Sequence, residues 1–396
     1  MKGPVVAAAT NQVVLSKEDM IGRATALRPI LAQRADQCEK LRRIPDETRD
    51  DFIRGGIVRM IEPVRYGGLG FDIDTLLETT LELGRACGSS GWMGSFWPLH
   101  NWMAGMWPEK AQQEYWADSP DTLSSTAWDV LNHKVTEVSG GVRLSGRWDF
   151  SSGCDHARWA MLFVPAAPAI LCLVPRKDFR ILDTWHVTGL SGSGSNDVVV
   201  EDAFVPQHRI LSMELAGKGQ TAGRELHGTP FYKLPLSTWL SYSLASPIFG
   251  MAQGAVDCFE ELLRVRVEGF TGEQAGTRPA FQLRLAEASA EVDAARLLMR
   301  RDVRDLMEWG NAGVEVPITE RLRIRRDITF GVKLCNQAVL RMFDAAGAHS
   351  INLSRPLQRF VRDVLSASRS GAINWDLTGE QYGRVRLGLP PTTYFY

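Results

Sequence analysis

Two clusters of serine and glycine lie about forty residues apart, and each is followed by a strand-like run. The first contains F-S-S-G at 150–153, and the second is L-S-G-S-G-S-N at 190–196. If 150–153 is extended, the side chains of Ser151 and Ser152 point to opposite faces. One hydroxyl would then face a flat bound ligand while the other faces the protein. The alternative is a serine-rich bulge or turn that binds nothing.

The segment from Ala86 to Trp107 has no charged residue and carries Phe96, Trp97 and His100. An imidazole among aromatic rings can act as a general base near neutral pH. A buried histidine with a purely structural hydrogen bond is the alternative. Glycine, serine and proline interrupt the segment, which therefore predicts a pocket or interface rather than a membrane span.

Three regions with different periodicity must position these residues. We expect an N-terminal α-helical domain at 1–117, a middle β-barrel domain at 118–225 and a C-terminal four-helix bundle at 226–396. Helices are predicted at 46–54, 91–107, 249–267, 281–307, 319–346 and 356–372, with two more that start at the capping residues Ser16 and Asp72. Strands are predicted at 135–138, 142–144, 159–164, 170–174 and 197–200, with 1–15 a loose arm and 210–235 a connector.

Composition excludes several classes of function. The 396 residues include 45 Lys plus Arg and 46 Asp plus Glu, so no basic field for nucleic acid is present. The six cysteines are scattered, which predicts neither a metal site nor a disulfide framework and fits a reducing, cytoplasmic location. No phosphate-binding P-loop, nicotinamide fingerprint, zinc motif or nucleophile elbow occurs.

The α–β–α order and four phrases resemble the acyl-CoA dehydrogenase fold. More narrowly, they resemble the two-component flavin-dependent monooxygenases built on it, which include the oxygenase component of p-hydroxyphenylacetate hydroxylase. The phrases are Y-G-G-L-G at 66–70, S-G-R-W-D-F-S-S-G at 145–153, the run 189–196 leading to F-V-P at 204–206, and P-L-Q-R at 356–359 with Arg362 and Asp363. They occur in the family's order along nearly the whole chain.

The resemblance implies an activity and its partners. Reduced FAD or FMN from a separate NAD(P)H:flavin reductase would react with O2, and the resulting C4a-hydroperoxyflavin would insert one oxygen atom into a small, flat aromatic substrate, indole-like or phenolic. The family also implies a homo-oligomer, a tetramer or a dimer, with no nucleic acid, membrane or metal involved. An acyl-CoA dehydrogenase-type flavin dehydrogenase, an N-oxygenase of an amine and a catalytically idle subunit are the alternatives.

The resemblance also assigns roles to residues. Ser152 falls where the family's hydroxyl contacts flavin N5, and His100 matches a substrate-facing histidine. The other flavin-contacting positions are Ser125, Thr126, Trp128, Ser193, Gly194, Ser195, Arg278, Phe281 and Gly347, of which Arg278 would reach the flavin phosphates of a neighbouring subunit. Phe96, Trp97, Trp128 and Trp375 would join His100 around the substrate. Ordinary strand, surface or core roles are the alternatives for each.

One position departs from the family pattern. Many members carry a second histidine about eight residues after the Arg-Asp pair, where this chain has Ser370. A dehydrogenase would need a carboxylate near this point, and Ser370 and Gly371 offer none, which disfavours dehydrogenation. The missing histidine favours a substrate that is electron-rich without losing a proton, such as an indole. Ser370 is therefore the third candidate catalytic residue.

Overall fold

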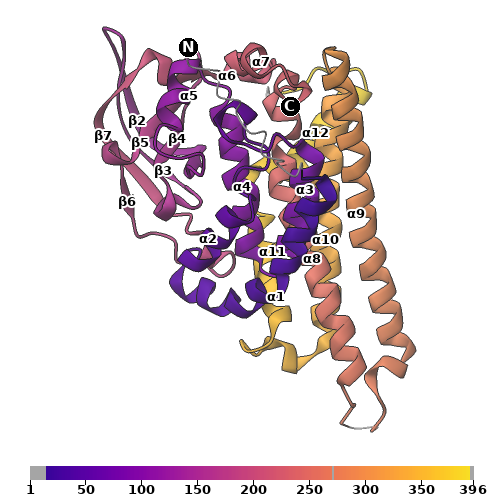
Figure 1. The fold of residues 1–396 in the computed structure, drawn as a ribbon. Coiled ribbons are helices and arrows are strands. Elements are labelled where there is room, and N and C mark those ends of the chain that lie inside the picture. Colours follow the sequence, from indigo (N-terminus) through magenta and orange to yellow (C-terminus); the bar gives the residue numbers. More distant parts are fainter. Residues whose placement is uncertain (1–14, 270–271, 393–396) are drawn as a thin grey trace, which may run out of the picture.

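The structure, a computed structural model, describes residues 15–269 and 272–392 (Figure 1). Most of the predicted N-terminal arm therefore lies outside the described residues. Five helices form the N-terminal part: α1 (Lys17–Leu41), α2 (Asp46–Arg54), α3 (Ile73–Gly84), α4 (Gly88–Ala104) and α5 (Glu109–Tyr115). The capping box at Ser16 and the cap at Asp72 start α1 and α3 as predicted.

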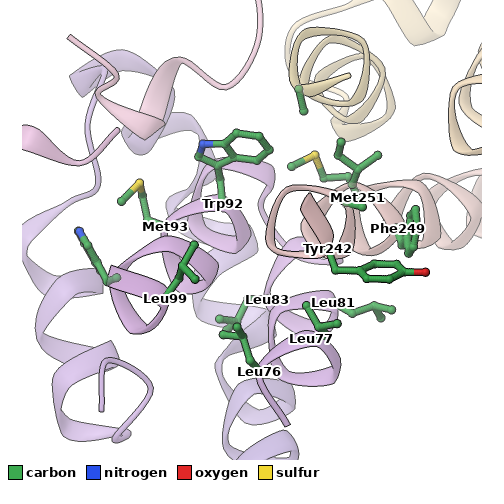
Figure 2. Close-up of a cluster of buried hydrophobic side chains, with 14 of the residues drawn as sticks. Leu76, Leu77, Leu81, Leu83, Trp92, Met93, Leu99, Tyr242, Phe249 and Met251 are labelled. Atoms are coloured by element: carbon green, nitrogen blue, oxygen red, sulfur yellow. The ribbon is translucent and has the colours of Figure 1, made fainter. Parts of the chain in front are cut away.

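Helix α4 is the central element of this part, because every residue of it except Phe96 is buried. Its glycines permit close packing on α3: a Cβ at Gly91 would lie 2.4 Å from the Cα of Gly84. Apolar side chains of α3, α4 and α8 meet in one buried cluster, part of which is drawn in Figure 2. The uncharged segment is thus a core helix and not a membrane span.

The middle region contains two four-stranded sheets with the orders β1-β4-β5-β8 and β2-β3-β7-β6. Their inner faces share one apolar core, so each sheet buries one face against the other. The predicted hairpin is confirmed, with its turn at Ser139 and Gly140. The strands are β1 (Ser124–Ala127), β2 (Asp129–Val138), β3 (Gly141–Asp149), β4 (Trp159–Val164), β5 (Ile170–Pro175), β6 (Arg180–Leu182), β7 (Asp197–Pro206) and β8 (Ile210–Ser212).

Long helices make up the C-terminal part, on the side of α3 and α4 away from the sheets (Figure 1). They are α8 (Leu236–Val265), α9 (Pro279–Ala312), α10 (Ile318–Ala346) and α11 (Pro356–Ala367), followed by α12 (Trp375–Arg386), which was not predicted. The short helices α6 (Met213–Gly217) and α7 (Ala222–His227) lie within the predicted connector, and the expected boundary at 225/226 falls inside α7.

The predicted start of α8 at Phe249 is wrong, because the helix begins at Leu236 and continues through Pro247. Proline has no N–H, so the carbonyl of Ser243 loses its usual helical donor. The hydroxyl of Ser95 in α4 replaces that donor at 2.7 Å. A tertiary hydrogen bond thus keeps the helix intact and fixes α8 against the helix that carries Phe96 and His100.

All six cysteines are free. Among the described residues, no helix is both long enough and apolar enough to cross a membrane.

Candidate active site

The Ser151–Ser152 segment is a turn and not an extended strand, so the strand prediction is wrong here. Strand β3 ends at Asp149, after which Phe150 and Gly153 adopt left-handed backbone conformations with φ values of 57° and 71°. These two residues reverse the chain and bring the amide of Gly153 to the carbonyl of Ser193 at 2.9 Å. The two serine clusters of the sequence therefore lie side by side, joined through their backbones.

Three buried hydroxyls from these clusters form a continuous chain. The Oγ of Ser195 lies 2.7 Å from the Oγ of Ser152 and 2.7 Å from the Oγ of Ser193. The indole Nε1–H of Trp92, on α4, donates to Ser152 Oγ at 3.3 Å. All three serines are nearly inaccessible to solvent.

The chain of three serine hydroxyls has one more O–H donor than the two hydrogen bonds within it require. Three hydroxyl protons serve two hydroxyl–hydroxyl bonds, so one O–H remains at one end. When Ser152 donates toward Ser195, its own oxygen accepts from Trp92 and can accept once more. When the chain points the other way, Ser152 has its proton free to donate. Ser152 can thus meet either a donor or an acceptor on a bound molecule.

Strand β1 borders the same turn. Ser151 donates to the hydroxyl of Ser125 at 3.0 Å, so this serine pairs with the protein as one of the two was expected to do. The next residue, Thr126, has a buried Oγ1 with no hydrogen-bond partner among the described residues. Trp128 follows directly after β1, is half-buried, and packs at a tilt against Phe163 with ring centroids 5.6 Å apart. An unpartnered buried hydroxyl is costly unless a bound molecule or water satisfies it.

One face of α4 presents three rings at intervals of four residues. Trp92 meets Phe96 edge-on at 4.9 Å, and Phe96 stacks on His100 at 5.8 Å with an interplanar angle of 3°. Phe96, the middle ring of the row, is half-buried and is the one residue of the helix that is not fully buried. The i, i+4, i+8 spacing was visible in the sequence, and it could have identified Trp92, which the sequence analysis omitted.

His100 is held in one tautomer. Its Nδ1–H donates to the carbonyl oxygen of Ser124 at 2.7 Å, since a carbonyl only accepts. Burial lowers the pKa of His100 to about 4, against a smaller opposite effect of this hydrogen bond. The imidazole is therefore neutral near pH 7, and Nε2 carries a lone pair that no other described group engages.

Helix α11 holds the second serine cluster, at 190–196, in place through its Arg-Asp pair. The carboxylate of Asp363 accepts from the backbone N–H of Leu190 at 2.7 Å, and Arg362 donates to the carbonyl of Thr188. A Cβ at Gly189 would lie 2.2 Å from the carbonyl oxygen of Arg362, so only glycine permits this approach. The Arg-Asp pair and the glycine-rich run, separate phrases in the sequence, form one structural unit.

A second cluster forms at the far end of the bundle, where α8 passes into α9 (Figure 1). The guanidinium groups of Arg266 and Arg278 lie over the ring of Phe281, at 5.8 and 5.9 Å from its centroid. Arg266 also donates to the carbonyl of Ala346, beside Gly347, at 2.7 Å. Three predicted cofactor-binding residues, Arg278, Phe281 and Gly347, therefore lie together, apart from the hydroxyl chain.

Comparisons with known proteins identify the family. Residues 242–374 match the family model of the acyl-CoA dehydrogenase C-terminal domain. The chain is 37% identical to the oxygenase subunit HsaA of a flavin-dependent monooxygenase from Rhodococcus jostii, over 93% of this chain and 98% of that protein. It is 35% identical to the oxygenase component of an FADH2-dependent resorcinol hydroxylase from a Rhizobium species, over 94% and 95% of the two chains.

A solved structure gives the same result. The 3-HSA hydroxylase from Rhodococcus sp. RHA1 superposes with a TM-score of 0.90 at 35% identity, covering 96% of this chain and 99% of that one. The chain belongs to the flavin-dependent monooxygenase oxygenase components of the acyl-CoA dehydrogenase fold. It therefore acts on reduced flavin and O2, and an oxygenase component works with a separate flavin reductase.

Two tryptophans predicted to bind the substrate of this oxygenase have neighbours outside the row of rings on α4. Trp97 is fully buried in the N-terminal core, edge-on to Phe52 and His156 at 6.2 and 5.7 Å. Trp375 packs between α12 and α10, where its ring meets Phe330 at 5.5 Å and the amino group of Lys333 at 5.2 Å. Neither residue contacts the row of rings on α4 in these interactions.

Ser370 lies in the turn after α11 and is half-buried. That turn is held to α8, since Ser241 donates to the carbonyl of Ala372 at 3.1 Å and Arg325 of α10 donates to the same serine hydroxyl. Gly194, a predicted cofactor-binding residue, has a left-handed φ of 57° and leaves no room for a Cβ beside Asp155, so its visible role is in the backbone of its loop. A catalytic role for Ser370 stays a prediction.

Two cavities of this oxygenase lie elsewhere. One of about 410 Å³ lies between α1, α8 and α11, and one of about 170 Å³ lies between the 61–71 segment and residues 226–232. Neither is lined by the predicted site residues. The candidate site consists of the buried hydroxyls, the rings on α4 and the unpartnered Thr126.

Proposed function

We propose that this oxygenase hydroxylates a phenolic ring and that His100 accepts the phenol's proton. The observation that carries the proposal is the committed tautomer of His100: Nδ1 donates to Ser124, which leaves Nε2 as an acceptor on a neutral ring. A buried neutral imidazole that already stacks on Phe96 is suited to receive a flat substrate with an acidic O–H. Resorcinol, the substrate named for one relative, is such a phenol.

An indole, the alternative raised by Ser370, needs no proton acceptor for its ring to be electron-rich. Trp92 and Phe96 would stack on either ring system, so these two residues do not discriminate between them. The free acceptor at His100 favours the phenol. An amine substrate for N-oxygenation would be favoured by carboxylates, whereas the row on α4 consists of aromatic rings.

The residues present fit a flavin ring. Thr126 Oγ1 is buried without a partner, and Ser152 can still accept or donate one hydrogen bond. Ser125, Ser193 and Ser195 would support these two groups from the protein side. When bound, reduced flavin supplies the electrons that activate O2. The chain's own part is to orient that ring, to exclude water and to hold the phenol's proton at His100 Nε2.

The second cluster supports an oligomer, a tetramer or a dimer, in which Arg278 serves a neighbouring subunit's flavin. Helix α8 contacts α4 at Ser243 and reaches Arg266 some 23 residues later, which is about 35 Å along a helix. One flavin would not span that separation within a single chain. It would contact both clusters if they come from different subunits.

The decisive experiment supplies purified protein with reduced FAD or FMN, O2 and matched substrates. A phenol, its O-methyl ether and indole present similar rings, but only the phenol has an acidic O–H. We expect oxygenation of the phenol at least about tenfold faster than of the ether, and a loss of about 100-fold on the phenol in His100→Gln. His133→Gln, on the exposed face of β2, is the matched control and should keep wild-type rates. Equal rates on indole or on the ether would overturn the proposal.

A further inference from the structure

A buried polar network lies beneath His100 and connects three helices or strands. The Oη of Tyr115, at the end of α5, lies 2.7 Å from Asn101 Oδ1 and 2.9 Å from Ser124 Oγ. Asn101 Nδ2 donates to the carbonyl of Val58 and to Glu62 Oε2, both at 3.2 Å. Tyr115, Asn101, Ser124 and Glu62 are all essentially inaccessible to solvent.

The protons of this network have one consistent arrangement. The carbonyl of Val58 only accepts, so the amide nitrogen of Asn101 faces it and its oxygen faces Tyr115. The single hydroxyl proton of Tyr115 is then committed to Asn101 Oδ1. The same hydroxyl makes its second contact with the Oγ of Ser124, at 2.9 Å.

Glu62 terminates the network as an acceptor that carries no charge near pH 7. Desolvation raises the pKa of its carboxyl to about 9, against the opposite effect of Arg59. Because the Glu62 carboxyl is neutral, the network contains no buried carboxylate that would attract the N–H protons of Asn101 more strongly.

We infer that Tyr115 and Asn101 are positioning residues, which hold the Ser124 carbonyl against His100 Nδ1 and thereby keep Nε2 available for the substrate. The inference rests on the proposed role of His100. The same serine supplies both contacts: its hydroxyl is held by Tyr115 and its carbonyl is held by His100. A carbonyl oxygen accepts a hydrogen bond but does not pass a proton on, so the network orients the base and is not a proton wire.

The test compares the variant Tyr115→Phe with the matched control Tyr242→Phe. Tyr242 is also fully buried, and its hydroxyl donates to Asp302 at 2.6 Å within the bundle. Each variant is assayed with an ordinary phenol and with a nitrophenol that is already ionised at the assay pH. Rates are expressed relative to wild type for each substrate, so that differences in ring reactivity cancel.

We expect Tyr115→Phe to lower kcat/KM for the ordinary phenol about tenfold or more and to leave the ionised phenol within about threefold of wild type. Tyr242→Phe should change both substrates by the same factor. An equal loss on both phenols in Tyr115→Phe would overturn the inference, because a purely structural residue does not distinguish their acidity.

His100→Gln separates this inference from the proposed function. If His100→Gln discriminates between the two phenols and Tyr115→Phe does not, the positioning role falls while the proposed function stands. If His100→Gln treats both phenols alike, the proposed function falls and the inference falls with it. If Tyr115→Phe fails to fold, Ser124→Ala is tested instead, because it removes the partner hydroxyl and keeps the carbonyl. We expect it to slow the ordinary phenol more than the ionised phenol. An equal effect on both phenols would overturn the inference.

Discussion

His100 shows how burial and one hydrogen bond fix the protonation state and tautomer of a side chain. The Ser124 carbonyl fixes which nitrogen carries the proton, and desolvation keeps the ring neutral. The hydroxyl chain at Ser152 is prepared differently, because its one spare proton leaves the choice of donor or acceptor to the bound molecule.

The acid limb of the pH–rate profile for phenol oxygenation should lie near pH 4 and not near the usual histidine value of about 6.5. The base is active when neutral, and burial lowers its pKa to about 4. Activity should therefore persist as pH falls from 7 to 5. Measuring kcat/KM from pH 4.5 to 8 checks this expectation, and an acid limb close to 6.5 would contradict it.

Acid denaturation must be separated from this limb. The unfolded chain binds a proton at His100 below about pH 6.5, whereas the folded chain does so only near 4. This histidine's contribution to stability is present above pH 6.5 and is lost as pH falls through its folded pKa. Enzyme held at each pH and then assayed at pH 7.5 should regain full activity wherever folding is intact.

Among the structural elements, the loop before β7 has the most constrained position. Its glycine at 189 lies against the backbone of α11, and Asp363 of that helix accepts from the next amide. The loop in turn carries Ser193 and Ser195, so α11 determines where the hydroxyl chain lies. This arrangement explains in physical terms why the Arg-Asp pair and the glycine-rich run occur together.

Gly189→Ala should weaken flavin binding and lower the free energy of unfolding by about 1–3 kcal/mol, because a Cβ would lie 2.2 Å from the Arg362 carbonyl. Gly217→Ala is the matched control, since nothing lies within 4 Å of the added methyl group. Denaturant titration and fluorescence titration with reduced flavin measure both quantities. Wild-type values for both in Gly189→Ala would show that the loop is not held as described.

On the scale of the whole molecule, the arginine cluster lies where α8 passes into α9 (Figure 1), whereas the hydroxyl chain lies between α4 and the loops after β3 and before β7. Helix α8 connects them, and its continuity through Pro247 depends on the hydrogen bond from Ser95. A chain in which the two predicted flavin-contacting clusters are so far apart is expected to complete its sites by association.

Arg278→Ala should raise the dissociation constant for flavin about tenfold, the effect of losing one charge-assisted contact. Arg284→Ala, an exposed arginine paired with Glu287 on the same helix, is the control and should bind flavin normally. Analytical ultracentrifugation of both variants should give the same assembly as wild type. Normal flavin affinity in Arg278→Ala, or a monomeric wild-type protein, would contradict the shared site.

The sequence predicted the regular elements well, because their signals are local. The capping box at Ser16, the turn at Ser139 and Gly140 and strand β4 each depend on residues within a few positions of one another. Proline at 247 indicated a helix start for the same local reason. The prediction failed there because the donor that proline lacks is replaced by Ser95, which lies 148 positions from the Ser243 carbonyl it serves.

The sequence supplied candidate residues for the site, but their arrangement could not be predicted from it. The pairing of Ser152 with Ser195 follows from left-handed conformations at Phe150 and Gly153, and nothing in the pattern F-S-S-G distinguishes that turn from a strand. Trp97 and Trp92 belong to the same aromatic run, yet only Trp92 shares a helical face with His100. Periodicity on α4 carried that information, whereas counting aromatic residues did not.

We propose that the Ser152 hydroxyl holds reduced flavin so that oxygen reaches the substrate. The most direct test is the fraction of reduced flavin whose oxidation yields hydroxylated product instead of hydrogen peroxide, measured in wild type, Ser152→Ala and the control Ser246→Ala. Ser246 is equally buried, but its hydroxyl bonds the Leu77 carbonyl at 2.6 Å within the helical core. We expect Ser152→Ala to lower the ratio of product to peroxide about tenfold and Ser246→Ala to leave it unchanged. An unchanged ratio in Ser152→Ala would contradict the role of the Ser152 hydroxyl.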